Sequence, residues 1–184
     1  MQIIIGISGA SGAVYGIKLL EKIQKIPEIQ SHLVISRAAR ITISQETDYS
    51  FKEIEALADY YHNYDNIASP IASGSYLVDA MIIAPCSTKT LAEIANGITP
   101  NILSRAADVI LKERKKLILM LRETPLHLGH IENMLKVTKI GGIIAPPVPA
   151  FYNKPKNMEE MIDYTVVRIL DSIGIHIESD KRWQ

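Results

Sequence analysis

The stretch IIIGISGASGAVY at residues 3–15 passes from an apolar run, through a loop of small residues, into the start of a helical pattern. Its β-branched residues are nearly continuous, which is typical of a strand in a parallel sheet with helices on both faces. Gly6, Gly9 and Gly12 then recur every third residue, so the backbone can turn sharply and present N–H groups at a helix start. The stretch therefore predicts a strand, a turn and a helix, with either a bound phosphate at the turn or a tight turn without a ligand.

The glycine spacing does not identify the anion. A dinucleotide fingerprint needs glycines at positions n, n+2 and n+5, and a nucleoside-triphosphate loop ends in Gly-Lys before Ser or Thr; the stretch contains neither. The next apolar run, residues 33–35, is followed by Ser36 and Arg37, where an NAD-binding unit usually places an acidic residue for the ribose. The sequence thus disfavours NAD and favours a mononucleotide or no nucleotide.

Length and charge exclude several classes of protein. A chain of 184 residues suits one domain with one core. Its 20 basic and 20 acidic residues cancel, so no long-range field points to nucleic acid or an anionic membrane as a partner. Cys86 is the single cysteine, which excludes an internal disulfide and a cysteine-rich metal site. The first apolar run has no basic leader, and no apolar stretch reaches the roughly 20 residues of a membrane span, so we expect a cytoplasmic protein.

Strand patterns and helical patterns alternate along the rest of the chain. Helical spacing predicts helices over residues 13–25, 38–45, about 51–58, 88–96, 101–112, 131–138 and 158–169. Apolar runs predict further buried strands over residues 81–84, 117–121 and 143–145. The expected fold is a single α/β domain, residues 1–184, with a doubly wound, mainly parallel sheet of about five or more strands. It is a Rossmann-like or flavodoxin-like three-layer sandwich, followed by a C-terminal tail from about residue 175.

Two segments carry more specific expectations. Residues 60–76 lack a period and are predicted to form a long loop, in which Tyr60, Tyr61 and Tyr64 either pack on the surface or face a ligand. In the last helix, the buried stripe is predicted to consist of Met158, Met161, Ile162, Val166 and Ile169. Arg168 does not belong to that stripe.

Polar loops follow several of the predicted strands. Residues 85–90, PCSTKT, end one strand and open a helix, and Arg122 with Glu123 ends another. Because open α/β sheets bind ligands at the carboxyl edge of their strands, we expect Ser11, Ser36, residues 87–90 and Arg122 to line one crevice. His127 and His130 lack further His or Cys at metal spacing, so we expect them to be helix-entry residues and predict no metal site.

The chain resembles the UbiX-type flavin prenyltransferases at seven separated motifs. These are GISGASGAVYG (6–16), the serine at 36, SQETD (44–48), APCSTKTLAEIANG (84–97), SRAADVILKER (104–114), LRETPLHLGHIENML (121–135) and PPVPAFYNKP (146–155). The resemblance implies an enzyme that binds reduced flavin mononucleotide (FMN) and transfers a dimethylallyl group from dimethylallyl monophosphate to N5 and C6 of the flavin, without a metal. It also implies a homododecamer with sites between subunits, and a UbiD-type decarboxylase that receives the prenylated flavin.

The same resemblance implies roles for individual residues. The flavin would be held by Gly9, Ala10, Ser11, Ser36, Ser87, Thr88, Lys89, Thr90 and Arg122. The prenyl phosphate would be surrounded by Tyr152, Arg168, Lys112, Arg105 and Glu123, with Trp183 as a candidate wall. Glu46 and Glu123 would handle protons, and Ser11 would lie near the reacting atoms. These residue types suit the chemistry, because a departing monophosphate needs cations and a proton donor placed in advance.

Two other functions remain open at this point. FMN-dependent cysteine decarboxylases share the expected fold but carry a Pro-Ala-Ser-Ala-Asn-Thr loop and a Pro-x-Met-Asn segment, whereas this chain has PCSTKT at 85–90 and ENM at 132–134. A non-catalytic flavin carrier would bind FMN as well. Such a carrier would not need Glu46, Lys112, Arg122, Glu123, Tyr152 and Arg168 together.

Overall fold

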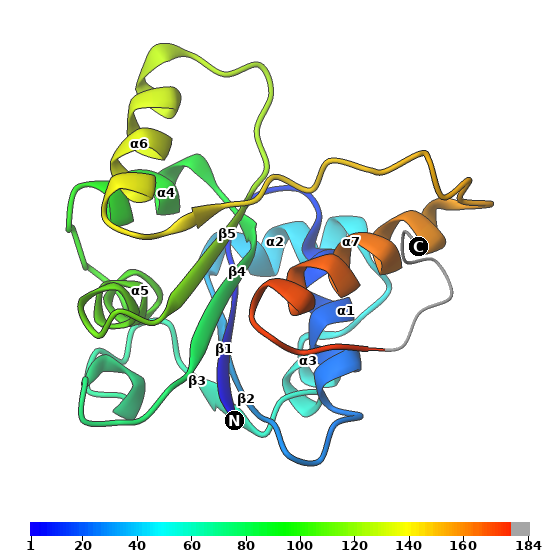
Figure 1. Ribbon diagram of the computed structural model, residues 1–184. Coiled ribbons are helices and arrows are strands. Elements are labelled where there is room, and N and C mark those ends of the chain that lie inside the picture. The colour runs from blue at the N-terminus through cyan, green and yellow to red at the C-terminus, as the bar shows by residue number, and fades with distance from the viewer. Residues whose placement is uncertain (178–184) are drawn as a thin grey trace.

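A computed structural model describes residues 1–177 of the chain, in which helices cover both faces of one parallel sheet (Figure 1). The described strands are β1 (Gln2–Ile7), β2 (Gln30–Ile35), β3 (Tyr60–His62), β4 (Ala80–Cys86), β5 (Lys116–Leu121) and β6 (Ile143–Ile144). They pair in the order β3-β2-β1-β4-β5-β6, and every pair is parallel. This order is that of the Rossmann fold, and it confirms the predicted doubly wound α/β class.

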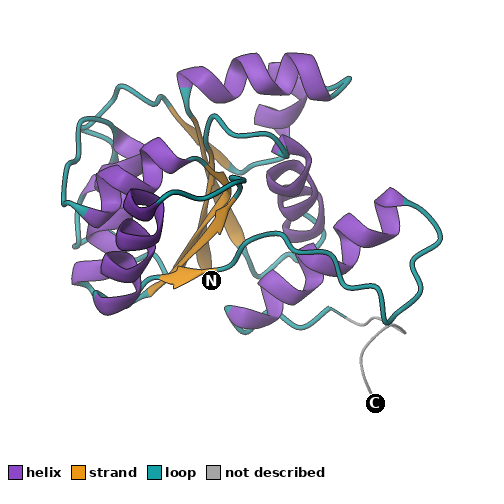
Figure 2. Cartoon of the chain, turned by 90° about the horizontal axis from the view of Figure 1, so that it is seen from above, coloured by secondary structure: helices purple, strands orange, loops and turns teal. Residues whose placement is uncertain are grey.

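The helices form two layers, which Figure 2 shows on either side of the sheet. One layer holds α1 (Ala13–Ile23), α2 (Arg37–Glu46), α3 (Phe51–Ala56) and α7 (Met158–Ser172). The other holds α4 (Thr88–Ala95), α5 (Ile102–Lys112), α6 (Leu128–Lys139) and the 3-10 turn η1 (Pro70–Ala72). Successive residues of β1 point to opposite layers: Ile3, Ile5 and Ile7 join the first core and Ile4 joins the second. The continuous apolar run at 3–5 is therefore explained by burial on both faces.

Two local predictions are wrong. Residues 60–76 are not a loop throughout, because Tyr60–His62 form β3 against His32, Leu33 and Val34 of β2. A three-residue strand that consists of Tyr and His offers no apolar alternation to detect. Met158 is 75% exposed as the first residue of α7, so the buried stripe of that helix begins later and is centred on Val166 and Ile169.

No helix within residues 1–177 is both long enough and apolar enough to cross a bilayer.

A buried histidine and a half-buried one join β2 to β3. His32 is 1% exposed, and its Nδ1 lies 2.9 Å from Nε2 of His62, whose own Nδ1 lies 2.6 Å from Oγ of Ser69. Burial and the neighbouring His62 lower the pKa of His32 to about 4, although the charge of Asp59 opposes this shift. Burial also lowers the pKa of His62. The folded chain therefore keeps His32 neutral at pH values where an unfolded chain would protonate it.

Acid should weaken the fold through this pair. The unfolded chain binds protons at His32 near its ordinary pKa of 6.5, while the folded chain binds none until about pH 4. The contribution of His32 to the free energy of unfolding should thus be fully present above pH 6.5. About 3 kcal/mol of stability should be lost as the pH drops from 6.5 to 4. Urea unfolding at several pH values would measure the drop. His32→Gln should show a smaller drop over the same range, and an equal drop would remove His32 from the effect.

Candidate flavin site

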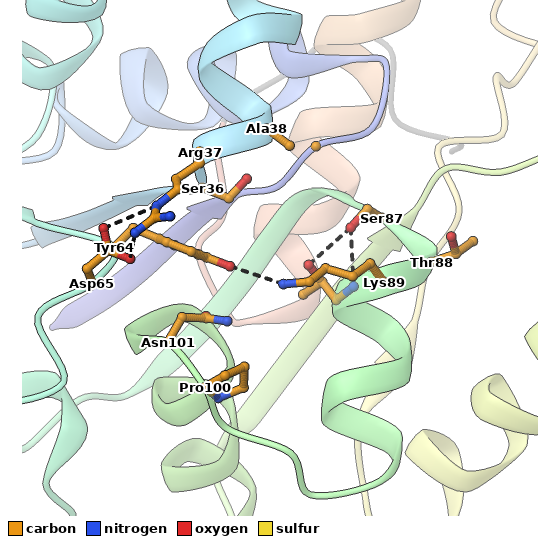
Figure 3. Close-up of a pocket in the computed structure, with 12 residues that line it drawn as sticks. Ser36, Arg37, Ala38, Tyr64, Asp65, Ser87, Thr88, Lys89, Pro100 and Asn101 are labelled. Atoms are coloured by element: carbon orange, nitrogen blue, oxygen red, sulfur yellow. Dashed lines mark hydrogen bonds and ion pairs between the residues drawn. The ribbon is translucent and has the colours of Figure 1, made fainter.

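A cavity of about 560 Å³ lies at the carboxyl edge of the sheet, near β1 and β4, where the strand order reverses (Figure 3). Its volume is in the range of small-molecule and cofactor sites. Its lining consists of Gly9, Ser36, Arg37, Ala38, Tyr64, Asp65, Ser87, Thr88, Lys89, Thr90, Pro100 and Asn101. Six of the nine predicted flavin residues are therefore brought together: Gly9, Ser36, Ser87, Thr88, Lys89 and Thr90.

The first turns of two helices open into this cavity. Ser36 caps α2, with its Oγ accepting a hydrogen bond from the Ala39 amide at 3.1 Å. Ser87 caps α4 in the same way through the Thr90 amide at 3.2 Å. Each helix start combines amides without an intrahelical acceptor and the positive end of a helix dipole. Together they make this part of the cavity suited to a phosphate.

A buried serine holds the loops of the cavity in register. Ser8 is fully buried, and its Oγ donates to the carbonyl of Pro85 at 2.9 Å while it accepts from the Ser87 amide at 2.7 Å. The Arg122 amide donates to the carbonyl of Cys86 at 3.1 Å, which ties the end of β5 to the same loop. The loops after β1, β4 and β5 are thus joined by hydrogen bonds. This structural role of Ser8 was not predicted from the sequence, because only burial distinguishes Ser8 from Ser11.

Gly9 is required by close packing between two lining segments. A Cβ atom on Gly9 would collide with the Cβ of Ala38 in the first turn of α2. A glycine lets the loop after β1 approach α2 closely enough to form one wall of the cavity.

The N-terminus of α1 is occupied by a side chain of the protein itself. Oε2 of Glu46 accepts hydrogen bonds from the amides of Gly12 at 2.8 Å and Ala13 at 3.4 Å. In the structure, the anionic group at the start of α1 is thus Glu46, whereas the starts of α2 and α4 open into the cavity. Glycine spacing indicated exposed amides but carried no information on which anion would reach them.

Ion pairs and hydrogen bonds join Lys89 and Arg37 of the cavity lining to Glu93, Tyr64 and Asp65. Nζ of Lys89 lies 2.7 Å from Oε1 of Glu93 and donates to the Tyr64 hydroxyl at 3.3 Å, while Arg37 pairs with Asp65 at 2.9 Å. Burial alone would lower the pKa of Lys89, but its bonds to Glu93 and Tyr64 outweigh this and raise it. Lys89 is therefore cationic at neutral pH. Tyr64 and Asp65 follow β3, so their positions could not be predicted without that strand. Of the two alternatives for Tyr64, the cavity supports the ligand-facing one.

The remaining residues predicted on the flavin side lie next to the cavity. Ala10 and Ser11 are half-buried in the loop after β1 and are not part of its lining. Arg122 and Glu123 are exposed at the end of β5, and the Glu123 carboxylate accepts from the Thr124 amide at 2.9 Å. Within residues 1–177 no hydrogen bond or ion pair engages the Arg122 guanidinium. This cation is therefore available at the edge of the cavity.

The residues predicted for the prenyl phosphate fall into separate places on one chain. Arg105 and Lys112 lie on α5, paired with Asp108 at 2.6 Å and with Glu113, respectively. Lys112 ends α5 just before β5 begins, whereas Arg122 follows the end of β5, and a strand of six residues spans roughly 17 Å. Lys112 and Arg122 therefore belong to opposite edges of the sheet.

The other predicted phosphate ligands lie at α7. Tyr152 contacts Tyr164 through its hydroxyl, and Arg168 pairs with Asp171 at 3.2 Å. Trp183 lies outside the described residues. The structure thus brings Tyr152 and Arg168 to one helix and leaves Lys112 and Arg105 elsewhere on the chain.

Other candidate groups have structural explanations. His127 is the N-cap residue of α6, and its ring stacks on that of His130 with the centroids 3.6 Å apart, as expected for helix-entry residues. Burial raises the pKa of the Cys86 thiol, so this cysteine is a core residue. Among the residues that the structure describes, no three His, Cys, Asp or Glu side chains form a group that could hold a metal ion.

The parallel sheet, the crevice near β1 and β4 and the two serine-capped helix starts define a mononucleotide-binding protein of the Rossmann type. The family model for flavoproteins matches residues 1–170, and the chain belongs to this family, in the group of UbiX flavin prenyltransferases. The chain is 50% identical to flavin prenyltransferase UbiX of Escherichia coli K12, over 100% of this chain and 98% of that one. It is also 50% identical to a probable UbiX-like flavin prenyltransferase of Bacillus subtilis 168, over 100% of this chain and 89% of the relative.

Solved structures agree with this assignment. A dodecameric FMN-dependent UbiX-like decarboxylase from Escherichia coli O157:H7 superposes with a TM-score of 0.98 at 44% identity, over 100% of both chains. AnUbiX in complex with FMN and dimethylallyl pyrophosphate gives a TM-score of 0.93 at 45% identity, over 100% of this chain and 98% of that one. The FMN-dependent cysteine decarboxylase TvaF is 17% identical with a TM-score of 0.65, over 80% of this chain and 90% of that chain. That likeness shows a shared fold alone.

Proposed function

We propose that this protein is a flavin prenyltransferase, which joins the dimethylallyl group of dimethylallyl monophosphate to N5 and C6 of reduced FMN and releases phosphate. The observation that carries the proposal is 50% identity, along the whole chain, to proteins named flavin prenyltransferases. The cavity at the carboxyl edge of the sheet supplies the place for the acceptor flavin. A UbiD-type decarboxylase would receive the prenylated product.

The cavity fits FMN better than a dinucleotide. Ser36, Ser87 and the first-turn amides of α2 and α4 would hold one phosphate group. At the third helix start in this region, that of α1, Glu46 already accepts from two amides, which disfavours a pyrophosphate there. We propose that Gly9, Ala10, Ser11, Thr88, Lys89, Thr90 and Arg122 complete the flavin site. Bound reduced FMN supplies the nucleophilic acceptor atoms.

The leaving phosphate would be stabilised by cations and a phenol. We propose that Arg168 and Tyr152 from α7 and its preceding loop, with Lys112 and Arg105 from α5, surround it. Fixed positive groups of this kind favour the separation of charge as the phosphate departs. Because Lys112 lies at the opposite edge of the sheet from Arg122, one chain cannot present both to one substrate. A homo-oligomer with sites between subunits would unite them, and a solved relative of this group is dodecameric.

Two carboxylates receive different roles in the proposal. Glu123 lies beside Arg122 and would shuttle a proton to the departing phosphate, a role that requires its carboxyl, exposed on the single chain, to be buried and protonated in the assembled site. Glu46 binds the amides of Gly12 and Ala13, so it fixes the turn that carries Ser11 close to the flavin. Glu46 would then contribute to proton transfer indirectly, by holding Ser11 in place. No metal takes part in the proposed reaction.

We also propose a cytoplasmic location, which the free thiol of the buried Cys86 supports.

The direct test is the mass of the flavin after reaction. Purified protein, reduced FMN and dimethylallyl monophosphate are mixed without oxygen, and the released flavin should be heavier by one dimethylallyl unit. Bound FMN of unchanged mass would contradict the transferase and favour a flavin carrier. Loss of carbon dioxide from a peptide with a C-terminal cysteine would favour a cysteine decarboxylase instead.

A further inference from the structure

Four polar side chains gather on one face of α7 and the loop before it: Tyr152, Tyr164, Arg168 and Asp171, which we call the α7 cluster. Tyr164, Arg168 and Asp171 are spaced four and three residues apart, so they share one helix face. The hydroxyls of Tyr152 and Tyr164 contact each other, and their rings meet edge to face with the centroids 5.9 Å apart. The cluster thus joins a loop residue to a helix face.

Asp171 holds the guanidinium of this cluster from the protein side. Its side chain is 9% exposed, with Oδ2 at 3.2 Å from Nη1 of Arg168 and Oδ1 at 3.0 Å from Nδ1 of His176. Arg168 itself is 59% exposed. A guanidinium has five N–H donors, so one held by a nearly buried carboxylate keeps several donors for an external anion.

Tyr164 holds the phenol of Tyr152 in a comparable way. Its hydrogen bond to Tyr152 raises the pKa of Tyr164, its partial burial adds to this, and the positive charge of Arg168 opposes the shift. Packing of α7 in the core depends on other residues, chiefly Val166, Ile169 and Leu170. The Tyr164 hydroxyl is therefore not needed for the core. Its partner is the hydroxyl of Tyr152, which contacts the prenyl phosphate in the proposed function.

We propose that Tyr164 and Asp171 are positioning residues of the prenyl-phosphate site, Tyr164 acting through Tyr152 and Asp171 acting through Arg168. The inference rests on the proposed function, which gives Tyr152 and Arg168 their contacts with the phosphate. Two long polar side chains that are held in place lose less freedom on binding an anion than two free ones. The cluster would present a phenol and a guanidinium to the same phosphate group.

The expected effects separate binding of the prenyl phosphate from binding of FMN. Tyr164→Phe removes one hydroxyl and should raise KM for dimethylallyl monophosphate about 3- to 10-fold, with FMN affinity unchanged and a smaller change in kcat. Asp171→Asn removes the charge that holds Arg168 and should raise KM about 10-fold. Inorganic phosphate, used as a competing anion, should inhibit both variants correspondingly less.

Matched controls are available on the same chain. Tyr49→Phe removes a hydroxyl that donates to Glu21 at 2.5 Å, away from the cluster. Asp163→Asn removes a carboxylate of α7 that pairs with Lys22 at 3.1 Å. Both variants should keep the KM of the unmodified protein. Tyr152→Phe combined with Tyr164→Phe should equal Tyr152→Phe alone, because Tyr164 acts only through Tyr152.

The outcomes distinguish the inference from the proposed function. If the unmodified protein transfers no prenyl group, the proposed function fails. If it transfers but Tyr164→Phe leaves KM unchanged, or if the two tyrosine changes are additive, Tyr164 is not a positioning residue. A variant in which FMN affinity falls together with the transfer rate, at unchanged KM, would also overturn the inference. Should Tyr164→Phe fail to fold, Asp171→Asn decides by the same KM criterion.

Discussion

Replacing Glu123 by glutamine should slow prenyl transfer by about 100-fold or more while FMN stays bound. Glutamine keeps the shape of the side chain but cannot give up an acidic proton, and general acid catalysis typically contributes about 10²- to 10⁴-fold. Glu123 follows β5 beside Arg122, next to the flavin cavity and not within its lining. The change should therefore act on departure of the phosphate and not on the flavin.

Single-turnover kinetics with reduced FMN and dimethylallyl monophosphate would measure this effect, with bound FMN determined separately. Glu132→Gln is a suitable control, because Glu132 is an exposed carboxylate of the neighbouring α6. It should transfer at the rate of the unmodified protein. Equal rates for Glu123→Gln and the control would exclude Glu123 as the proton donor.

Replacing Ser8 by alanine should weaken both the fold and the flavin site. The change leaves the part-buried Ser87 amide without its acceptor and takes one donor from the buried Pro85 carbonyl. An unsatisfied buried polar group costs about 1 to 3 kcal/mol, so the free energy of unfolding should fall by that amount. Because Ser87 caps α4 at the cavity, FMN affinity should fall as well.

Thermal unfolding and FMN titration would test the Ser8 prediction together. Ser44→Ala is a matched control, since the Ser44 hydroxyl donates to the Ile41 carbonyl on the exposed side of α2. It should leave FMN affinity unchanged and affect stability little. If Ser8→Ala bound FMN as tightly as the control does, the hydrogen bonds of Ser8 would not be what shapes the site.

The fold could be predicted from the sequence because its strongest elements carry strong patterns. β1, β4 and β5 are continuous apolar runs, and α1 and α5 have clear helical spacing that ends at Pro27 or begins at Asn101. β3 could not be predicted, because it is held by its pairing with β2 and by the contact of His62 with the buried His32, not by its own composition. Local patterns do not report pairing between distant segments.

The site was predictable to the extent that it follows the carboxyl ends of strands. Ser36, Ser87 and Lys89 were found by this rule and by the resemblance to UbiX-type enzymes. Asp65 and Asn101 were not, and Tyr64 was left with two alternatives, because the approach of these residues to the cavity depends on how the missed strand and the start of α5 are arranged. The separation of Lys112 from Arg122 also had no sequence signal, since it is set by the length of β5.

The carboxylate of Glu46 at the start of α1 affects which phosphate-bearing ligands a sheet with this strand order can bind. Proteins with the same strand order commonly use that helix end for the pyrophosphate of a dinucleotide. Here the Glu46 side chain already accepts hydrogen bonds from two amides at that helix end, so a second phosphate would have to displace it. We therefore expect this contact within the chain to favour FMN, with its single phosphate, over larger flavin nucleotides.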